Sequence, residues 1–251
     1  MKTPLKKVLE TKARQLRREV LELTVEHGHA HLGGSFSEIE ILVSLFDVVM
    51  KEKQDKFLLS KGHGYYPLYL LLKEKGYNPS ISSHPNFDPK NGINNTAGSF
   101  GHGLPIGLGI ALAKRIRKQK GTIYVLLGEA CCQEGTMWES CLIATTHKLD
   151  NLTIIVDRNH IQALERTEDV LPSLERLGDA LEGLGVHVSE VNGHDFGELI
   201  PALQQKVTGR PKVVIAHTVK GKGVSFMEND PKWHGRAPNA QEVEQARKEL
   251  Q

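Results

Sequence analysis

Two patterns of apolar residues alternate along this chain. The first is a short, nearly continuous apolar run, typical of a strand that is buried on both faces. Such runs occupy residues 56–60, 122–127, 152–156, 186–191 and 212–217. The second is the spacing of an amphipathic helix, with an apolar residue at every third or fourth position. Helical segments are predicted at residues 5–27, 39–50, 65–75, 106–118, 173–184, 195–207 and from 239 onward.

Strands that alternate with helices predict an α/β fold, in which a parallel sheet is flanked by helices. No internal repeat or low-complexity linker divides residues 1–251, so we expect a single domain. Three longer stretches have no clear periodicity: 78–95, rich in Pro, Ser and Asn, the glycine-rich 96–105, and 218–235. Long irregular loops inside compact domains tend to carry function, so these are candidate binding loops.

A loop rich in glycine and histidine follows the first predicted helix. It holds three histidines and three glycines within residues 26–35. A zinc site is one interpretation, but alternate spacing in a glycine loop lacks the geometry of a histidine pair on one helix face, and we do not favour it. Just after the loop, Ser37 and Glu40 have the spacing of a capping box, which predicts a helix start at about residue 39.

The central stretch 122–161 has the order strand, turn, helix, strand. The first strand ends in Gly128-Glu129-Ala130, and a helix-compatible segment follows to residue 139. The second strand ends in Asp157-Arg158-Asn159. Ligands of parallel sheets bind beyond the carboxyl ends of the strands, so Glu129 and Asn159 are candidates for one shared site.

Glu129 and Asn159 suit a divalent cation that is bound to a phosphate. Carboxylate, amide and carbonyl oxygens are the ligands of Mg²⁺, which keeps few protein ligands while substrate phosphates complete its shell. A helix starting after Gly128 would point free N–H groups toward the same anion. Taken alone, the Gly-Glu-Ala sequence also fits an ordinary turn with a solvated glutamate.

The charge and cysteine content of the chain exclude several classes of ligand and cross-link. The 32 Lys and Arg residues against 30 Asp and Glu leave a charge of +2, which gives no indication of nucleic-acid binding. All three cysteines lie within residues 131–141 without CxxC spacing, so neither a zinc site nor a disulfide framework is indicated. The charged amino-terminal segment and the lack of an apolar run of about 18 residues predict no signal peptide and no membrane span, and we expect a cytoplasmic protein.

Six segments, taken together and in order, resemble transketolase, and more narrowly the separately encoded amino-terminal half of split transketolases. They are Gly28-His-Ala-His-Leu-Gly-Gly-Ser35, Phe57-Leu-Leu-Ser-Lys-Gly-His63, Gly98-Ser-Phe-Gly-His-Gly103, Glu134-Gly-Thr-Met-Trp-Glu139, Asp157-Arg-Asn159 and residues 220–235. The resemblance covers nearly the whole chain. It implies the thiamine diphosphate-binding fold and, within it, the domain that binds the diphosphate (the PP-type domain).

The resemblance also implies roles for particular residues. The metal, Mg²⁺ or alternatively Ca²⁺ or Mn²⁺, would be held by Glu129, Asn159 and the backbone carbonyl of Ile161. The cofactor-binding residues would be His63, His234, Gly98, Phe100, Gly128, Glu129, Ala130, Asn159 and Ile161. His31, His84 and His234 would face the substrate, and Glu134 would lie at a dimer interface that links two active sites. Each histidine has the alternative of a structural role, and Glu134 that of an ordinary first-turn glutamate.

Four positions depart from the family pattern, and all are near the cofactor. Glu129 stands where the family has aspartate, and its carboxylate reaches one methylene further. Ala130 stands where the family has glycine, at a turn that we expect its methyl group to crowd. Ala30 also replaces a glycine, and Leu164-Glu165 replaces an Asp-Gly pair.

The reaction implied by the resemblance is transfer of a two-carbon ketol unit from a ketose or ketose phosphate donor to an aldose acceptor. The glutamate that activates the cofactor and the groups that hold a sugar phosphate are expected on a pyrimidine-binding domain, which this sequence lacks. We therefore expect activity only with a partner, a carboxyl-terminal transketolase-like subunit, in an α2β2 complex. Two alternatives stay open: a pathway-specific subunit that serves a carrier or unusual acceptor, and a degenerate non-catalytic subunit.

Overall fold

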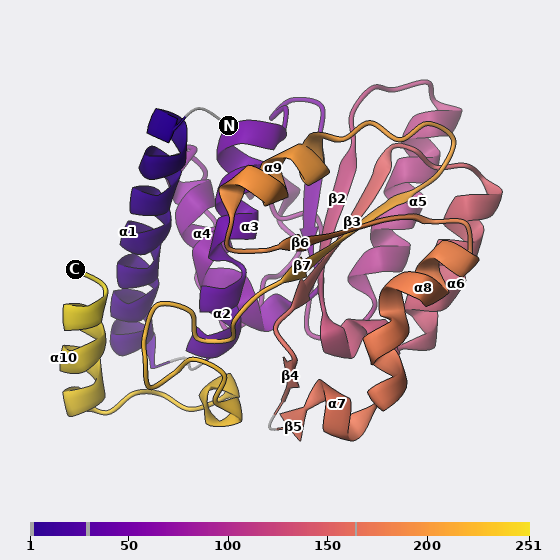
Figure 1. The fold of residues 1–251 in the computed structure, drawn as a ribbon. Helices are drawn as coiled ribbons and strands as arrows, with labels where there is room; N and C mark the ends of the chain where they lie inside the picture. Colours follow the sequence, from indigo (N-terminus) through magenta and orange to yellow (C-terminus); the bar gives the residue numbers. More distant parts are fainter. Residues whose placement is uncertain (1–2, 29–30, 164) are drawn as a thin grey trace.

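The computed structural model describes residues 3–28, 31–163 and 165–251; Ala30 and Leu164 lie outside these residues. Its main sheet has five strands, all parallel, in the order β1-β2-β3-β7-β6 (Figure 1). In chain order the strands are β1 (Lys56–Leu59), β2 (Ile123–Gly128), β3 (Leu152–Arg158), β6 (His187–Asn192) and β7 (Lys212–His217). The prediction of a parallel sheet with flanking helices is confirmed.

Helices cover both faces of this sheet, because side chains along each strand alternate between two cores (Figure 1). On β1, Phe57 and Leu59 enter one core and Leu58 enters the other. The first core packs against α1 (Thr3–His27), α3 (Ile39–Ser44), α4 (Tyr65–Glu74) and α9 (Phe196–Gln204). The second packs against α5 (Gly103–Ile116), α6 (Gly135–Thr146) and α8 (Leu177–Gly183). The last helix, α10 (Ala240–Glu249), lies beside α1.

The order of the strands creates a crevice at one edge of the sheet. The chain runs through β1, β2 and β3 in turn, passes to the edge strand β6, and returns to place β7 beside β3. After β3 the chain continues to α8 in the second core, whereas after the neighbouring strand β7 it continues to Val224 and Met227 in the first core. Loops that leave neighbouring strands toward opposite faces open a crevice at their carboxyl ends, where ligands of such sheets bind.

Two helical predictions need correction near this crevice. Part of the predicted glycine-histidine loop is helical, as α2 (Leu32–Ser37), and the predicted helix 39–50 is α3 followed by a π-helical turn at Leu45–Val49. Ser37 is not a helix cap: it is fully buried, and its hydroxyl donates to Asp157 Oδ2 at 2.6 Å. The predicted capping box was wrong because a buried carboxylate accepts that hydroxyl hydrogen.

The connection after Gly128 also differs from the prediction. A five-residue 3-10 turn, Glu129–Gln133, follows β2, and α6 begins only at Gly135. The prediction of a helix amino terminus aimed at an anion from Gly128 was therefore wrong. Beyond β3, a hairpin that the sequence did not indicate pairs β4 (Ile161–Gln162) with β5 (Glu165–Arg166), and α7 (Thr167–Val170) follows.

Long loops are fixed to the sheet by side chains. Strand β1 is at an edge, and its carbonyls at Phe57 and Leu59 accept bonds of 3.0 Å from the Nδ2 atoms of Asn94 and Asn95. These bonds occupy part of an otherwise open strand edge and hold the loop that carries His84. Short α2 contacts the turns Gly62–Gly64 and Pro231–His234, which brings three distant segments together. Among the described helices, none is long and apolar enough to cross a membrane.

Candidate active site

A cavity lies beyond the carboxyl ends of β2 and β3, where the fold predicts a ligand site. Its empty volume, together with the open solvent at its mouth, is about 370 Å³. Residues singled out from the sequence that line it are His63, Phe100, Gly128, Glu129, Ala130, Asn159, Ile161 and His234. Two lysines that the sequence analysis did not single out, Lys61 and Lys220, also line it. Both lysines lie in segments that resemble transketolase, each close to a glycine or a histidine. This position in the motifs is the feature of the sequence that could have identified them as site residues.

Four histidines from distant segments meet beside this cavity. The ring centroids of His63 and His234 are 5.1 Å apart, and His31 lies 5.6 Å from His63, 5.3 Å from His234 and 5.9 Å from His84. His31 Nδ1 donates to the backbone carbonyl of His234 at 2.5 Å, which fixes the side on which His31 carries its hydrogen. The structure thus brings together all four histidines that the sequence analysis had selected.

His63 and His234 are neutral at physiological pH. Burial, with Lys61 and His234 as the next causes, holds the pKa of His63 well below its usual value. Burial and then the charge of Lys220 lower the pKa of His234 to about 4. A neutral imidazole has one donor and one acceptor nitrogen, so these rings can orient polar groups of a ligand without adding charge.

Glu129 is buried, with 3% of its surface exposed, and its two oxygens differ. Oε2 accepts the backbone N–H of His160 at 2.5 Å, whereas Oε1 accepts no hydrogen bond from any described residue and lies 3.9 Å from Arg158 Nε. Burial is the largest cause that raises the pKa of this carboxyl, to about 7. A buried carboxylate oxygen without a donor costs free energy unless a cation or a proton meets it.

Asn159 is held so that its amide oxygen faces the next residues of the chain. Its Nδ2 lies 3.4 Å from both Asp157 Oδ2 and Ser37 Oγ, and its Oδ1 accepts the Ile161 N–H at 3.2 Å. Asp157 offers only acceptor atoms, so the amide nitrogen must point toward it and the oxygen away from it. The carbonyl of Ile161, the other predicted oxygen donor, lies 3.5 Å from Lys220 Nζ.

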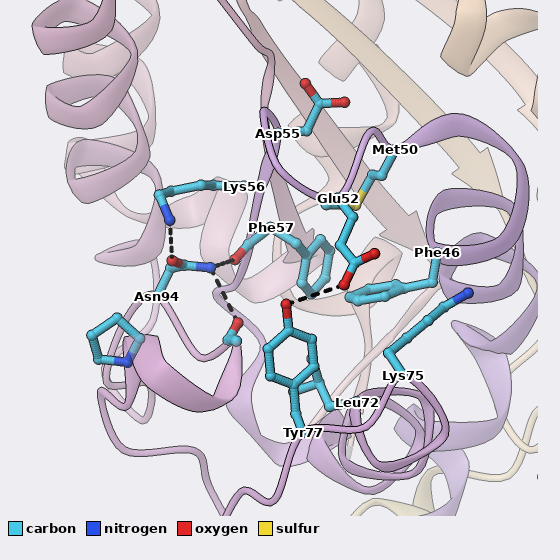
Figure 2. Close-up of a pocket in the computed structure, with 12 residues that line it drawn as sticks. Phe46, Met50, Glu52, Asp55, Lys56, Phe57, Leu72, Lys75, Tyr77 and Asn94 are labelled. Carbon is cyan, nitrogen blue, oxygen red and sulfur yellow. Dashed lines mark hydrogen bonds between the residues drawn. The ribbon is translucent and has the colours of Figure 1, made fainter.

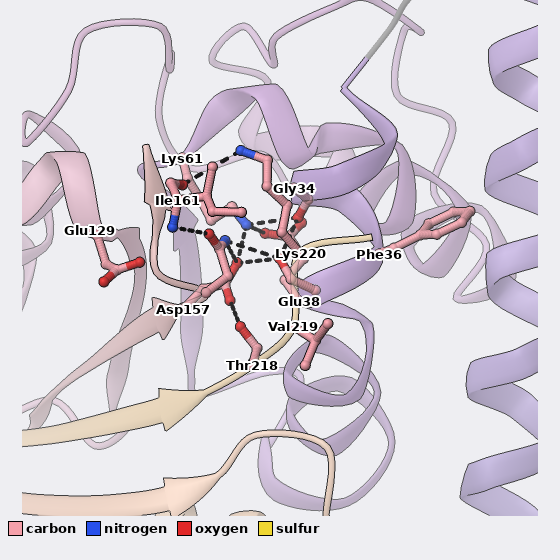
Figure 3. Close-up of polar contacts among 12 residues, drawn as sticks. Gly34, Phe36, Glu38, Lys61, Glu129, Asp157, Ile161, Thr218, Val219 and Lys220 are labelled. Carbon is pink, nitrogen blue, oxygen red and sulfur yellow. Dashed lines mark hydrogen bonds and ion pairs between the residues drawn. The ribbon is translucent and has the colours of Figure 1, made fainter. Parts of the chain in front are cut away.

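A buried group of charges underlies the cavity (Figure 3). Lys61 Nζ pairs with Asp157 Oδ2, lies 3.0 Å from Glu38 Oε2 and donates to the Gly34 carbonyl at 2.8 Å. Burial opposes the charge of Lys61, but Asp157 and Glu38 outweigh it and raise the pKa of Lys61. Burial is the largest cause that raises the pKa of Glu38, to about 8. The ammonium of Lys61 is therefore already satisfied beneath the cavity.

Lys220 differs from Lys61 because no described carboxylate is paired with its ammonium. Only 1% of Lys220 is exposed, and among the described residues no carboxylate pairs with its Nζ. The nearest polar atoms are His234 Nδ1 at 3.3 Å and the Ile161 carbonyl at 3.5 Å. Burial, with the charge of Lys61 second, lowers the pKa of Lys220 to about 8. A buried cation that faces a cavity and lacks a counter-ion suits an anionic ligand.

The remaining selected residues occupy other positions. Glu134 is exposed at the start of α6 and packs against the backbone at Gly101, and it is not among the residues that line the cavity. Gly98 has φ of +138° and lies near His84, also outside the lining. Ala130 lines the cavity within the 3-10 turn and is not among the residues with positive φ, so the backbone there does not require glycine.

These residues fit a metal ion bound to a diphosphate. The unpartnered oxygen of Glu129, the amide oxygen of Asn159 and the Ile161 carbonyl are hard oxygen donors, and Lys220 supplies a cation for the phosphates. No three His, Cys, Asp or Glu side chains converge as metal ligands in the described part of the chain. A metal here would therefore depend on one carboxylate, that of Glu129, together with amide, backbone and phosphate oxygens; magnesium sites built around phosphates commonly use only one or two carboxylates.

A second cavity lies at the amino end of β1, the opposite end of that strand (Figure 2). Its walls include Phe46, Phe57 and Tyr77, and its empty volume is about 880 Å³. Its lysines are already engaged: Lys56 donates to Asn94 at 3.1 Å, and Lys75 pairs with Asp47 at 3.1 Å. Although larger, it lacks the histidines and unpartnered charges of the first cavity, which is the candidate active site.

An α/β domain with a buried cation and oxygen donors at the carboxyl edge of its sheet is suited to bind an anionic ligand. Residues 16–251 match the family described as transketolase, thiamine diphosphate binding domain. The chain is 36% identical to an apulose-4-phosphate transketolase subunit of Actinobacillus succinogenes, over 96% of this chain and 95% of that protein. It is 34% identical to the 6-deoxy-6-sulfo-D-fructose transketolase subunit SqwG of Clostridium sp. strain MSTE9, over 88% of each. The chain belongs to the transketolase family.

Solved structures agree on the fold. The transketolase of Campylobacter jejuni superposes with a TM-score of 0.86 at 26% identity, over 97% of this chain and 43% of that one. The transketolase of Leishmania mexicana gives 0.88 at 24% identity, over 96% and 41%, which shows the fold alone. The chain spans about two fifths of the length of these solved proteins and nearly all of the subunit-type relatives. It is therefore a subunit of transketolase type with the thiamine diphosphate-binding fold.

Proposed function

We propose that this chain binds the diphosphate half of thiamine diphosphate, together with Mg²⁺, in the cavity beyond β2 and β3. The observation that carries the proposal is that two buried groups line one cavity: Glu129, whose Oε1 accepts no hydrogen bond within the described residues, and Lys220, whose ammonium pairs with no carboxylate there. A metal diphosphate would satisfy both. Glu129 Oε1, Asn159 Oδ1 and the Ile161 carbonyl would hold the metal, and Lys220 and His63 would contact the phosphate oxygens.

When bound, thiamine diphosphate supplies the electron sink that transfer of a two-carbon ketol unit requires. The residues of this chain would bind the cofactor and orient the substrate. The rings of His31, His84 and His234 meet beside the cavity and would hydrogen-bond hydroxyl groups of the donor sugar. Burial and then the charge of nearby Lys220 favour the neutral form of His234, so its ring would orient donor hydroxyl groups through hydrogen bonds without adding charge. Gly98 and Phe100 would flank the cofactor rings.

We further propose that the enzyme is complete only with a second chain. The relatives from Actinobacillus and Clostridium are named as subunits and have nearly the same length as this chain, which supports a separate partner. A carboxyl-terminal transketolase-like subunit would supply the pyrimidine-binding domain, in an α2β2 complex. Exposed apolar side chains on the adjacent helices α5 and α6, Ile106, Leu142 and Ile143, support an interface there, and Glu134 stands at the start of α6.

The substrates would be a ketose or ketose phosphate donor and an aldose acceptor. The named relatives act on unusual sugars, apulose 4-phosphate and 6-deoxy-6-sulfo-D-fructose, which favours a second version of the proposal, a subunit dedicated to one modified sugar. The non-catalytic alternative has less support, because the buried oxygen and the buried ammonium both remain at the cavity. Substrate choice would depend on groups of the partner.

The test is native mass spectrometry of the protein purified from its own source, followed by calorimetric titration with thiamine diphosphate and MgCl₂. We expect a second chain to co-purify and cofactor binding to depend on the metal. Binding that is equally tight in excess EDTA would reject the metal assignment. A chain that runs alone and binds no thiamine diphosphate, with or without Mg²⁺, would favour the non-catalytic alternative.

A further inference from the structure

The backbone segment 218–220 brings Lys220 from the end of β7 to the cavity, and each of its first two residues has a defined anchor. The Thr218 N–H donates to the Arg158 carbonyl at 3.0 Å, and the Thr218 hydroxyl donates to Asp157 (Figure 3). The Val219 N–H donates to His194 Nε2 at 2.8 Å. The two groups that bind Thr218, the Arg158 carbonyl and the Asp157 carboxylate, belong to β3, and the cavity residue Asn159 follows directly after that strand. The Val219 anchor comes from outside the cavity, since His194 is not among its lining residues.

The hydrogen bonds of His194 define its tautomer. Because Nε2 accepts from Val219, the hydrogen of the neutral ring is on Nδ1, which donates to Glu40 Oε2 at 2.9 Å. Glu40 is held in turn by both terminal nitrogens of Arg17, at 2.8 and 2.7 Å. Arg17 and Glu40 are 5% and 7% exposed, so this chain of bonds is shielded from water.

The Arg17–Glu40–His194 chain joins elements that are far apart in sequence. Arg17 lies on α1, Glu40 on α3 and His194 in the loop between β6 and α9. The bidentate geometry of Arg17 holds the Glu40 carboxylate in one orientation. That carboxylate fixes the plane and the tautomer of the His194 ring, as carboxylates do for histidines that ligate metals. The ring can then present only an acceptor to Val219.

We propose that His194 is a positioning residue for Lys220: it fixes the backbone at Val219, and thereby the place of the Lys220 ammonium beside His234. The inference rests on the proposed binding of thiamine diphosphate and goes beyond it, because His194 does not touch the cavity. A lysine side chain has four rotatable bonds, so its terminal nitrogen is placed accurately only when its backbone is fixed. A backbone shift of about 1 Å is enough to disturb a charge-assisted contact with a phosphate oxygen.

The first test compares two substitutions of similar size. In His194→Gln the amide oxygen can occupy the place of Nε2 and accept from Val219, whereas in His194→Asn the shorter amide can reach only the Glu40 side. We expect hydrogen exchange of the Val219 amide to rise at least tenfold in His194→Asn and to remain near wild type in His194→Gln. Equal exchange in wild type and His194→Asn overturns the proposal, whether or not the protein binds thiamine diphosphate.

The second test measures affinity for thiamine diphosphate with Mg²⁺ in the complete complex. We expect His194→Asn to weaken binding roughly tenfold. This is the lower end of the range of affinity losses seen when a residue that orients a ligand-binding residue is substituted. The control is His147→Asn, at an exposed histidine, which should bind as wild type does. Melting temperature without cofactor is measured for each variant, so that loss of stability is separated from loss of affinity.

A double-mutant cycle then distinguishes an effect of His194 on the position of Lys220 from a general loss of order in the site. If His194 acts through Lys220, His194→Asn should weaken binding far less in a Lys220→Met background than in wild type. Equal losses in the two backgrounds overturn the proposal. Failure of the wild-type complex to bind thiamine diphosphate would instead reject the proposed function, and the amide exchange measurement would still decide whether His194 fixes Val219.

Discussion

The carboxylate of Glu129 reaches the backbone N–H of His160: its Oε2 lies 2.5 Å from that nitrogen, and its Oε1 accepts no hydrogen bond within the described parts of the chain. The side chain links the end of β2 to the residue after Asn159. The extra methylene, compared with the aspartate usual in the family, is therefore used to span the two strand ends. The other oxygen, Oε1, lies 3.9 Å from Arg158 Nε.

Glu129→Gln should weaken metal-dependent cofactor binding. The amide oxygen can still accept from His160, so the local structure is kept while the negative charge is lost. We expect the affinity for thiamine diphosphate in the presence of Mg²⁺ to fall at least about tenfold. Calorimetric titration across a series of MgCl₂ concentrations measures this. Glu139→Gln, at an exposed glutamate on α6, is the control, and Mg²⁺ dependence equal to wild type in Glu129→Gln would contradict the assignment.

Lys220→Met should reduce cofactor binding without destabilising the free protein. A buried ammonium without an anion costs free energy, and methionine has a similar shape without the charge. The melting temperature without ligand is therefore expected to stay equal or rise, while affinity for thiamine diphosphate falls. Lys222→Met, two residues on, is the control, since Lys222 pairs with Glu228 at 3.3 Å and lies nearer the surface. A loss of stability with unchanged affinity would show a structural role instead.

Gly64 packs closely against the side chain of Glu38, so substitutions at these two positions should have coupled effects on the free energy of unfolding. A methyl group at residue 64 would lie 2.7 Å from Glu38 Cδ, too close for an unstrained contact. Gly64 has φ of −87°, so Gly64→Ala carries no backbone penalty and should destabilise only through this overlap, by about 1–3 kcal/mol. Urea unfolding measures the change.

The same overlap should disappear when Glu38 is shortened. In a Glu38→Ala background, Gly64→Ala should cost less than in wild type, which a double-mutant cycle measures. Gly183→Ala is the control, because nothing lies within 4 Å of the added carbon there. Equal costs of Gly64→Ala in the two backgrounds would show that Glu38 does not set the size of residue 64.

Glu40 predicts a pH dependence of stability. Burial alone would raise the pKa of this carboxyl, but the charge of Arg17 and the hydrogen bond from His194 outweigh it and lower the pKa to about 2. The folded state therefore binds the proton less readily than the unfolded state does. Glu40 contributes its full stabilisation above the ordinary carboxyl value of 4.5 and loses it as pH falls toward 2.

The expected loss from Glu40 is on the order of 3 kcal/mol over that pH range. Unfolding curves of wild type and Glu40→Gln at pH 6 and pH 3 isolate this contribution. The difference in unfolding free energy between the two proteins should be large at pH 6 and should shrink at pH 3. A difference that is equal at both pH values would mean that Glu40 titrates normally in the folded protein.

Much of the fold could be predicted from local patterns. The buried apolar runs at 152–156 and 212–217 identified strands because side chains buried on both faces leave a continuous apolar signal. Helix α10 began where Asn239 predicted it, and a capping box of Asn239 with Glu242 accounts for that. Ser37 and Glu40 have the same kind of spacing but form no cap, because each contacts a partner more than 20 residues away.

Local periodicity and the order of the motifs were enough to predict the alternation of strands and helices, the family, and the residues placed after each strand. Which charges are satisfied depends on how the distant segments pack together. Lys61 and Lys220 both lie near glycine-rich motifs. The ammonium of Lys61 is bound by Asp157 and the Gly34 carbonyl, whereas among the described residues no carboxylate pairs with the ammonium of Lys220. Such pairing depends on distances between segments as far as 96 residues apart, which folding sets and local pattern does not encode.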